Sequence, residues 1–500
     1  MRKVVLAGWR KHNQIGSMVL VLWLAWAVRL IEMYGHNLWI DEAFHVYVAR
    51  QPFWELLTAF GRGTNFPPLF GWMLHLWMEN GQIDFYLRML PVLTSVLAVA
   101  VMFALGRLVF SPSVGWVSAF VVAVAPRSVY YGQEVTPYPF VLLLAALCPL
   151  LLERYYRRPA LVRLLSFIGA GAAAISLHYE MVPYVMALVL VGTAYLFVRV
   201  WHRERRQFVY WMLGLGVLAL IGIALLLYHA LPQQAQMGST FVPARYKGTI
   251  SLRNEVAEWF PQTVELVRFL FWSYEPTSLK WFTVILLVLG GIAAMAFSSR
   301  RVVVYLVVGL LIGYIASGFG VMPYANRYVW YAFPLCTLLV CAGAFAPAQA
   351  RTKGYPVFIS WGVAAVLIGL LVAHLPRVSG KLPETEQFND VLQYVEKRRQ
   401  PEDTVYVYYG AVLAFRVYAA QAVANGAVLE SWDRALPLAE QRAKMWAVME
   451  GKPRTWLLMS HVNPGDDTNL LDKLNKKCRS LDAIQVVGAA GYLFDCALAQ

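Results

Sequence analysis

The chain has 500 residues, of which 59% are hydrophobic and only 14% are charged. Soluble globular chains carry about 25% charged residues, so this composition excludes an ordinary soluble protein and indicates an integral membrane protein. The formal net charge of +14 suggests nucleic-acid binding, but the basic residues lie in short stretches between apolar runs, as membrane orientation requires. We therefore expect a lipid bilayer as the partner, and no nucleic acid.

The N-terminal segment is basic and leads into an apolar run at residues 15–34. A cleaved signal peptide is the alternative, because Ala25-Trp26-Ala27 has the small-residue form of a cleavage site. The apolar run continues past that site, so an uncleaved first transmembrane helix is predicted.

Ten further runs are predicted as helices at residues 86–105, 114–130, 137–153, 161–177, 181–199, 209–229, 279–297, 302–319, 328–347 and 356–375. Each is long enough to cross roughly 30 Å of hydrocarbon, which gives about eleven transmembrane helices. The apolar segment 66–78 is shorter and opens with Pro67-Pro68, which favours a re-entrant or interfacial helix.

Lys and Arg gather at the N-terminus and in every second connection between the predicted helices. The positive-inside rule places these basic segments in the cytoplasm, so the C-terminus lies outside it. The expected location is the inner membrane of a bacterial-type cell, with multiple spans and an extracytoplasmic C-terminal domain.

From about residue 375 onward, polar and charged residues become frequent. Helices are predicted at 384–399, 437–450 and 467–478, with strands at 404–409, 455–460 and 484–487. This alternation indicates a small α/β domain. We therefore expect two domains, a transmembrane module at 1–375 and a soluble domain at 376–500.

None of the five cysteines has the spacing of a metal site. Cys148, Cys336 and Cys341 lie in apolar runs and are predicted to be inert packing residues. Cys478 and Cys496 lie in the C-terminal domain, where a disulfide bond or two free thiols are both open alternatives.

The candidate functional residues are ionisable groups in the connections predicted to lie outside the cytoplasm, namely Asp41, Glu42, Glu134, His178, Glu180, Arg245, Lys247 and Arg327. Ionisable groups at membrane depth are costly and are functional candidates for that reason. The alternative is that the carboxylates are solvated helix caps, that Arg327 snorkels at a helix end and that His178 is structural.

Three motifs occur in a fixed order: Trp39-Ile40-Asp41-Glu42, then Phe66-Pro67-Pro68-Leu69, then Tyr131-Gly132-Gln133-Glu134 followed by Pro137-Tyr138. With this topology the chain resembles the GT-C membrane glycosyltransferases over about residues 15–350. The branch with protein O-mannosyltransferases and lipid A aminoarabinose transferases is the most similar. The chain departs from that branch at Val135-Thr136, where many relatives carry a basic residue.

This resemblance implies transfer of a hexosyl or pentosyl group from a polyprenyl-phosphate donor to a lipid, glycan or protein acceptor on the outer face. An inverting displacement is expected, with Asp41 as the general base and Glu42 and Glu134 as further catalytic residues. The lipid phosphate and the sugar are expected to contact some of Arg327, Tyr328, Arg245, Lys247, His178, Glu180 and Tyr138, with Arg62 and Arg88 as weaker candidates. No cofactor is certain, and a divalent metal held by Glu134, His178 and Glu180 stays open.

A transporter or flippase of lipid-linked glycans is the main alternative, and a glycan ligase or polymerase is another. A transporter requires charged or helix-breaking groups near the bilayer midplane. Here the charges gather at one end of the predicted bundle, which favours the transferase. The sequence does not identify the sugar, the acceptor or the length of the carrier.

Overall fold

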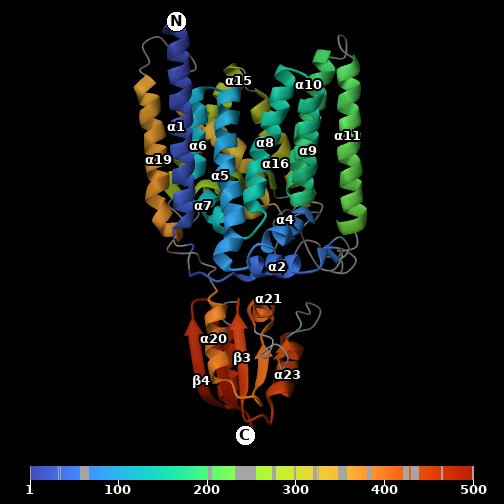
Figure 1. Cartoon of the computed structure of the whole chain (residues 1–500), viewed down its shortest axis with the longest axis vertical. Coiled ribbons are helices and arrows are strands. Elements are labelled where there is room, and N and C mark those ends of the chain that lie inside the picture. The colour runs from blue at the N-terminus through green and yellow to red at the C-terminus, as the bar shows by residue number, and fades with distance from the viewer. Residues whose placement is uncertain are drawn as a thin grey trace. The chain divides into compact units, whose positions relative to one another are not determined.

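The computed structural model describes residues 2–31, 33, 35–53, 55–56, 67–200, 205–230, 255–272, 277–297, 300–318, 324, 326–346, 357–379, 386–419, 427–429, 438–462 and 466–497. Its internal contacts divide the chain into two compact units (Figure 1). The helical unit comprises Met1–Ile31, Pro52–Met73 and Arg88–Lys381, and the sheet unit comprises Glu32–Gln51, Leu74–Leu87 and Leu382–Gln500. The sheet unit thus contains two early segments, Glu32–Gln51 and Leu74–Leu87, besides the C-terminal residues. The sequence predicted a single division of the chain, between residues 375 and 376.

The first part of the chain is helical: α1 (Arg2–Leu30), α2 (Ile40–Ala49), α4 (Leu69–Met78), α5 (Asp84–Val109), α6 (Pro112–Val124), α7 (Pro126–Gln133), α8 (Tyr138–Arg157), α9 (Leu161–Leu177), α10 (Met181–Val200), α11 (Arg205–Leu225), η1 (Leu226–Ala230), α14 (Glu255–Trp272), α15 (Thr277–Phe297), α16 (Arg300–Gly318), η2 (Asn326–Ala332), α17 (Phe333–Ala344) and α19 (Val357–Ser379). Every predicted apolar run falls on one or two of these helices. The short apolar segment 66–78 forms α4, of ten residues.

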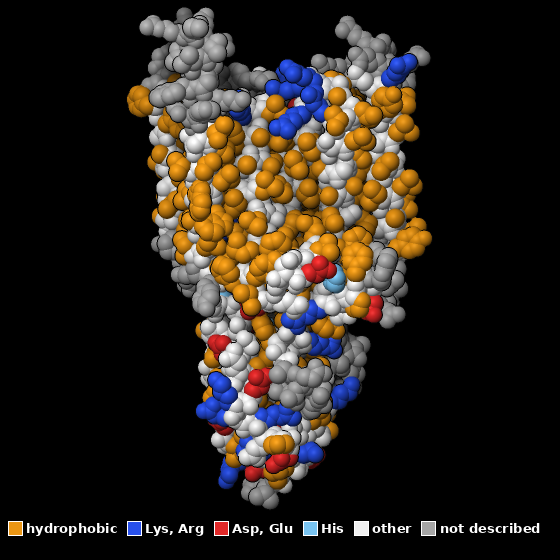
Figure 2. All heavy atoms as spheres, viewed as in Figure 1, with side chains coloured by type: hydrophobic (Ala, Val, Ile, Leu, Met, Phe, Trp, Pro, Cys, Tyr) orange, Lys and Arg blue, Asp and Glu red, His pale blue; other side chains and the backbone are white. Residues whose placement is uncertain are grey.

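Within the described residues, eight helices are long and apolar enough to cross a membrane, or nine if α6 and α7, bent by 55°, form one broken span. Helix α9 and the described apolar part of α1 have lengths of 10–17 residues. The count of eleven spans therefore stays a prediction. On the face that Figure 2 shows, the coloured side chains of the helical unit are mostly hydrophobic, with Lys and Arg gathered at one end, as a surface in contact with lipid requires.

Helices α15 and α17 approach each other at two glycines, Gly290 and Gly343. A methyl group at Gly290 would overlap the carbonyl oxygen of Leu339, and one at Gly343 would overlap that of Leu286. Small residues allow this close backbone approach between helices in a membrane, where packing replaces the hydrophobic effect. The contact fixes α17, which continues directly from the segment that carries Arg327.

We expect Gly290→Ala to destabilise the helical unit by about 1–3 kcal/mol, because the added methyl group must separate α15 from α17. The neighbouring Gly291→Ala is the matched control, since nothing lies within 4 Å of a methyl group there. This control should be neutral or slightly stabilising, because Ala favours helix more than Gly. Thermal unfolding in detergent measures both variants, and equal melting temperatures would contradict the packing described.

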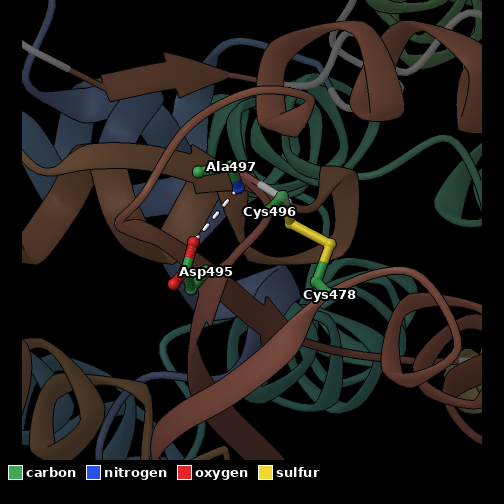
Figure 3. The surroundings of a disulfide bond; sticks show 4 residues. All are labelled: Cys478, Asp495, Cys496 and Ala497. Carbon is green, nitrogen blue, oxygen red and sulfur yellow. Dashed lines mark hydrogen bonds between the residues drawn. A yellow bond between two sulfur atoms is a disulfide. The ribbon is translucent and has the colours of Figure 1, made fainter. Parts of the chain in front are cut away.

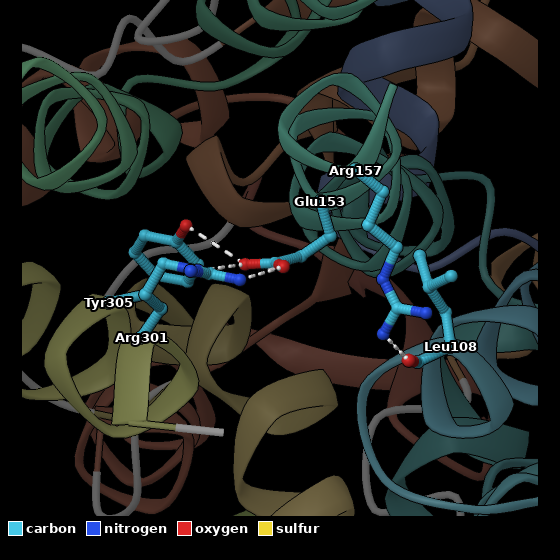
Figure 4. A network of polar contacts seen from close by, with 5 residues as sticks. All are labelled: Leu108, Glu153, Arg157, Arg301 and Tyr305. Carbon is cyan, nitrogen blue, oxygen red and sulfur yellow. Dashed lines mark hydrogen bonds and ion pairs between the residues drawn. The ribbon is translucent and has the colours of Figure 1, made fainter. Parts of the chain in front are cut away.

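A buried carboxylate ties α8 to α16 in the helical unit (Figure 4). Glu153 accepts hydrogen bonds from Nε of Arg301 at 2.8 Å, from Nη2 of Arg301 at 2.6 Å and from the Tyr305 hydroxyl at 3.2 Å. The Arg301 guanidinium also lies 4.5 Å from the ring centroid of Tyr195. One turn after Glu153, Arg157 donates to the carbonyl of Leu108. These contacts satisfy the charge of Glu153 without substrate, so this group is structural.

The sheet unit contains α20 (Phe388–Arg398), β1 (Thr404–Val407), η3 (Tyr409–Ala411), α21 (Val412–Tyr418), β2 (Ala427–Leu429), α23 (Leu438–Met449), β3 (Thr455–Ser460), α24 (Asp466–Asn475), β4 (Arg479–Val486) and β5 (Ala489–Asp495). The strand order is β2-β1-β3-β5-β4. β1 pairs in parallel with β2 and β3, with Val405 opposite Ala427 and Trp456, whereas β5 pairs antiparallel with β3 and β4. The predicted α/β domain is present, but β2 and β5 were not predicted.

Cys478 and Cys496 form a disulfide bond (Figure 3). Cys478 directly precedes β4 and Cys496 directly follows β5, so the bond closes the open end of the β4–β5 hairpin. Beside it, the backbone N–H of Ala497 donates to Oδ1 of Asp495 at 3.1 Å. Of the two alternatives that the sequence left open, the disulfide is the one that the structure contains. Cys148, Cys336 and Cys341 are buried and are not disulfide-bonded.

Candidate functional site

The predicted site residues fall in both units, and those of the sheet unit are Asp41 and Glu42. They lie in the first turn of α2, where negative side chains are favoured by the helix dipole. Glu42 is 1% exposed, and its Oε2 accepts a hydrogen bond at 3.2 Å from the backbone N–H of Trp39. Glu42 therefore caps α2, in the manner of the glutamate of a capping box. Asp41 is partly exposed, so of the two carboxylates it is the one that solvent reaches.

In the helical unit, the motif Tyr131-Gly132-Gln133-Glu134 forms the end of α7. A methyl group at Gly132 would lie 2.7 Å from Nε of Arg29, so only glycine leaves room for the arginine there. Nε2 of Gln133 donates to the carbonyls of Arg29 at 3.0 Å and Ile31 at 2.9 Å. Two residues of the motif thus fasten α7 to the end of α1, which fixes the positions of Tyr131 and Glu134.

Arg29 is fully buried, and all five of its N–H groups are used. Nε donates to Oγ of Ser95, Nη1 to the carbonyls of Ala25 and Ala123, and Nη2 to the carbonyl of Val122 and to Oγ of Ser128, at 2.8–3.1 Å. These acceptors are neutral, and two of them, the carbonyls of Val122 and Ala123, lie in the last turn of α6.

The reason for this arrangement lies in the break between α6 and α7. Pro126 has no N–H to donate to the carbonyl of Val122 four residues earlier, so the proline interrupts the helix. A carbonyl freed inside a membrane must find another donor. Arg29 and the Ser128 hydroxyl, which donates to Val122 at 2.8 Å, supply that donor. Arg29 therefore stabilises the bend that directs α7 toward its polar neighbours.

We expect Arg29→Met to destabilise the protein by about 3 kcal/mol, because the carbonyls at the end of α6 lose a charged donor. Arg29→Lys should recover part of this loss, since an ammonium group donates fewer bonds from a different geometry. The exposed Arg206, in the first turn of α11, provides the control variant Arg206→Met. The melting temperatures of these variants in detergent measure the loss of stability. An Arg29→Met protein as stable as the Arg206→Met protein would show that the bend forms without Arg29.

Most of the predicted substrate-binding residues meet around Arg327 in η2. We call this group the Arg327 cluster, and it consists of Tyr131, Glu134, Tyr138, His178, Glu180, Arg327 and Trp330. The ring of Tyr131 lies 4.8 Å from that of Tyr138 and 4.9 Å from that of Trp330, and Tyr138 lies 5.6 Å from His178. Arg327 is partly exposed and interacts electrostatically with Tyr131, Tyr138 and Glu180. Its guanidinium lies 5.6 Å from the ring of Tyr328, the next residue in the chain and another predicted substrate contact.

The turn between α9 and α10 contributes His178 and Glu180, which are 4% and 1% exposed. Nδ1 of His178 accepts the backbone N–H of Glu180 at 3.2 Å, which fixes the orientation of the imidazole ring. Nδ1 also lies 3.6 Å from Oε1 of Glu180. Burial raises the pKa of Glu180 well above its ordinary value, and the backbone N–H of Trp330 and the charge of Arg327 act against this rise.

The Arg327 cluster can therefore bind an anion and a polar ligand together. A guanidinium can hold two oxygens of a phosphate group in one plane. The tyrosine hydroxyls, the imidazole and the carboxylates around it are hydrogen-bonding groups of the kind that fix the orientation of a ligand in a pocket.

Two arginines were not among the predicted functional residues, Arg29 and Arg127. Arg127, on α7, is 8% exposed, and its guanidinium lies 5.6 Å from the ring of Tyr131 and 4.4 Å from that of Phe269. The signal that could have found both is an ionisable residue inside an apolar run, which marks a structural or functional polar site in a membrane protein.

Some predicted positions lie outside the described residues, namely Arg62, Phe66, Arg245 and Lys247. Arg88, a weaker candidate, is 6% exposed on α5. In the described part of the chain, no three His, Cys, Asp or Glu side chains form a group that could hold a metal ion. The metal alternative with Glu134, His178 and Glu180 stays a prediction.

Residues 65–229 match a family model described as dolichyl-phosphate-mannose-protein mannosyltransferase. The crystal structure of ArnT from Cupriavidus metallidurans in the apo state matches with a TM-score of 0.58 and 14% sequence identity, over 98% of this chain and 99% of ArnT. The chain has the GT-C fold. The predicted resemblance is thus confirmed at the level of the fold.

Two further structures share the GT-C fold with this chain. ArnT from the same organism bound to undecaprenyl phosphate matches with a TM-score of 0.57 and 14% identity, over 97% of this chain and 99% of ArnT. The archaeal oligosaccharyltransferase AglB from Archaeoglobus fulgidus, in complex with an inhibitory peptide and a dolichol-phosphate, matches with a TM-score of 0.51 and 9% identity, over 97% of this chain and 74% of AglB. No curated protein has a sequence that matches this chain.

Proposed function

We propose that the chain is a GT-C glycosyltransferase that moves a sugar from a polyprenyl-phosphate carrier to a hydroxyl group of a lipid, glycan or protein outside the cytoplasm. The observation that carries this proposal is the Arg327 cluster, in which a guanidinium, two buried carboxylates and tyrosine hydroxyls converge at the ends of several helices. The fold supports it, because ArnT with this fold is described with bound undecaprenyl phosphate.

In the proposed reaction, the acceptor hydroxyl attacks the anomeric carbon of the sugar as the bond between that carbon and the phosphate oxygen breaks. The hydroxyl proton passes to the carboxylate of Asp41, because a hydroxyl is a poor nucleophile without a base. The electron pair of the broken bond stays on the lipid phosphate, whose added charge needs a cation. A single displacement of this kind inverts the anomeric carbon.

The roles follow from the chemistry of each group. Arg327 holds the lipid phosphate in two hydrogen bonds. Tyr138, Tyr328, His178 and Glu180 contact the sugar or the phosphate. Glu134, held in place by α7, orients the acceptor, and Arg245 and Lys247 are proposed as additional phosphate contacts.

The experiment that tests this function is mass analysis of the cell-envelope lipids and glycans of cells with and without the chain. We expect one sugar modification to disappear without it, and its polyprenyl-phosphate-linked donor to accumulate. Cells that carry the Asp41→Asn chain should match the cells without it. An unchanged set of envelope glycans and lipid-linked sugars would contradict the proposal.

The proposed orientation predicts that residues 380–500 lie outside the cytoplasm, because the basic connections face inward. A reporter enzyme that works only in the periplasm should be active when fused after Arg377 and inactive when fused after Arg158. Expression of both fusions is checked by immunoblot. The reverse pattern of activity would show that the whole assignment of sides is inverted.

A further inference from the structure

The sheet unit holds the helix that carries Asp41. Three consecutive residues at the end of α21, Arg416, Val417 and Tyr418, make hydrogen bonds to residues at both ends of α2. Figure 1 shows α21 and α2 next to each other, and both belong to the sheet unit.

The chain that enters α2 is held by Tyr418. Its hydroxyl accepts the backbone N–H of Leu38 at 2.7 Å and donates to Oδ2 of Asp84 at 2.6 Å. One hydroxyl thus uses both its donor and an acceptor site. Leu38 lies three residues before Asp41, so this bond restrains the backbone directly ahead of the proposed base.

The other end of α2 is held by the two preceding residues of α21. Nη1 of Arg50 donates to the carbonyl of Val417 at 2.6 Å, and Nη1 of Arg416 donates to the Tyr47 hydroxyl at 2.8 Å. Arg50 also interacts electrostatically with Tyr418 and Asp84, which joins the contacts at the two ends. A helix of ten residues that is fixed at both ends has little freedom to rotate or shift.

Helix α21 is itself a fixed element of the C-terminal domain. Its Ala414 and Phe415 are buried at 1% and 2% exposure. In the chain, β1 is followed by η3 and then by α21. Between β1 and η3, the backbone N–H of Tyr408 donates to the carbonyl of Leu458 in β3 at 2.9 Å. The restraint on α2 therefore comes from the sheet and not from a mobile loop.

We propose that Tyr418 is a positioning residue for Asp41, so that the C-terminal domain is part of the catalytic apparatus and not a separate appendage. This inference rests on the proposed role of Asp41 as the base. Displacement of a catalytic group by about 1 Å can cost a hundredfold in rate, although the displaced group is chemically intact. Tyr418 has this influence because its hydroxyl holds the backbone at Leu38.

The test uses the full-length protein in detergent with the variant Tyr418→Phe, which removes the hydroxyl and keeps the ring. We expect the single-turnover rate of polyprenyl-phosphate release to fall by between about tenfold and a hundredfold. The dissociation constant for undecaprenyl phosphate and the melting temperature should stay near those of the parent. Tyr492→Phe is the matched control, because it removes another hydroxyl of the same unit, one that accepts a hydrogen bond from Nε2 of Gln485 at 2.9 Å on the β4–β5 hairpin.

Two further variants separate positioning from general damage. Asp84→Asn retains an oxygen acceptor for the Tyr418 hydroxyl and should keep most of the activity. The double variant Asp41→Asn/Tyr418→Phe should be no slower than Asp41→Asn alone, since Tyr418 acts through Asp41 and the two effects do not add. Additive losses, or a Tyr418→Phe protein that loses lipid binding and stability together with rate, would overturn the inference.

The failure of this inference is distinguishable from failure of the proposed function. If Asp41→Asn is impaired while Tyr418→Phe turns over like the parent, the base stands and the positioning role is wrong. If Asp41→Asn turns over like the parent, the proposed base is wrong and the role of Tyr418 is overturned with it.

Discussion

Asp41→Asn is expected to lower the rate of sugar transfer by about 10²–10⁴-fold, which is the usual contribution of a general base. The amide keeps the size and the hydrogen bonding of the side chain but cannot take the acceptor proton. The dissociation constant for the lipid-linked donor should change little, because the proposed phosphate contacts lie elsewhere. Single-turnover rates and donor binding, measured on the same preparation, test both parts of this expectation.

The control for this variant is Asp390→Asn, which changes another aspartate in the first turn of a helix of the same unit. Asp390 is exposed on α20 and has no proposed role. Its substitution should leave both the rate and the binding unchanged. Equal rates for Asp41→Asn and Asp390→Asn would remove Asp41 from the reaction.

Arg327→Ala is expected to weaken binding of both the donor and the released polyprenyl phosphate, since both carry the phosphate group that Arg327 is proposed to hold. Hydrogen bonds to a charged group contribute about 1.5–3 kcal/mol, so the dissociation constant should rise roughly 10- to 100-fold. Arg327→Lys should recover only part of the loss, because an ammonium lacks the paired geometry of the guanidinium. Titration with undecaprenyl phosphate in detergent measures the effect.

Arg300→Ala is the control for Arg327→Ala, because it removes an exposed arginine from the first turn of α16 at the same change in net charge. If Arg327→Ala binds undecaprenyl phosphate as tightly as Arg300→Ala does, then Arg327 only snorkels at a helix end. The phosphate contact would then have to be sought at Arg88 or Arg62.

The positions of the membrane helices could be predicted because each needs a long apolar run, and every predicted run is helical in the structure. The break at Pro126 was not predicted, because the apolar run continues across it and the compensating donor, Arg29, lies far away in the sequence. Strand β5 was missed because its Ala-Ala-Gly start lacks the β-branched residues that mark a strand. Its pairing with β3 and β4 decides its conformation, and that pairing is not a local property of the sequence.

The site was predicted only in part. Glu134, Tyr138, His178, Glu180 and Arg327 were chosen from three separate connections, and the structure brings them together in the Arg327 cluster. Their roles stay predictions. The sequence could not show that Glu42 caps its own helix or that Gly132 makes room for Arg29, because both depend on contacts that form only in the folded chain.

The most direct measurement is the release of polyprenyl phosphate by the purified protein in detergent, from lipid-linked sugars extracted from its own membranes and supplied with a membrane acceptor fraction. Detergent removes the two compartments that transport requires, so only a transferase can act. We expect one polyprenyl phosphate to be released for each sugar transferred, with inversion at the anomeric carbon and with little release by Asp41→Asn. Absence of release in detergent, together with movement of the lipid-linked sugars across vesicles that contain the protein, would contradict it and identify a transporter.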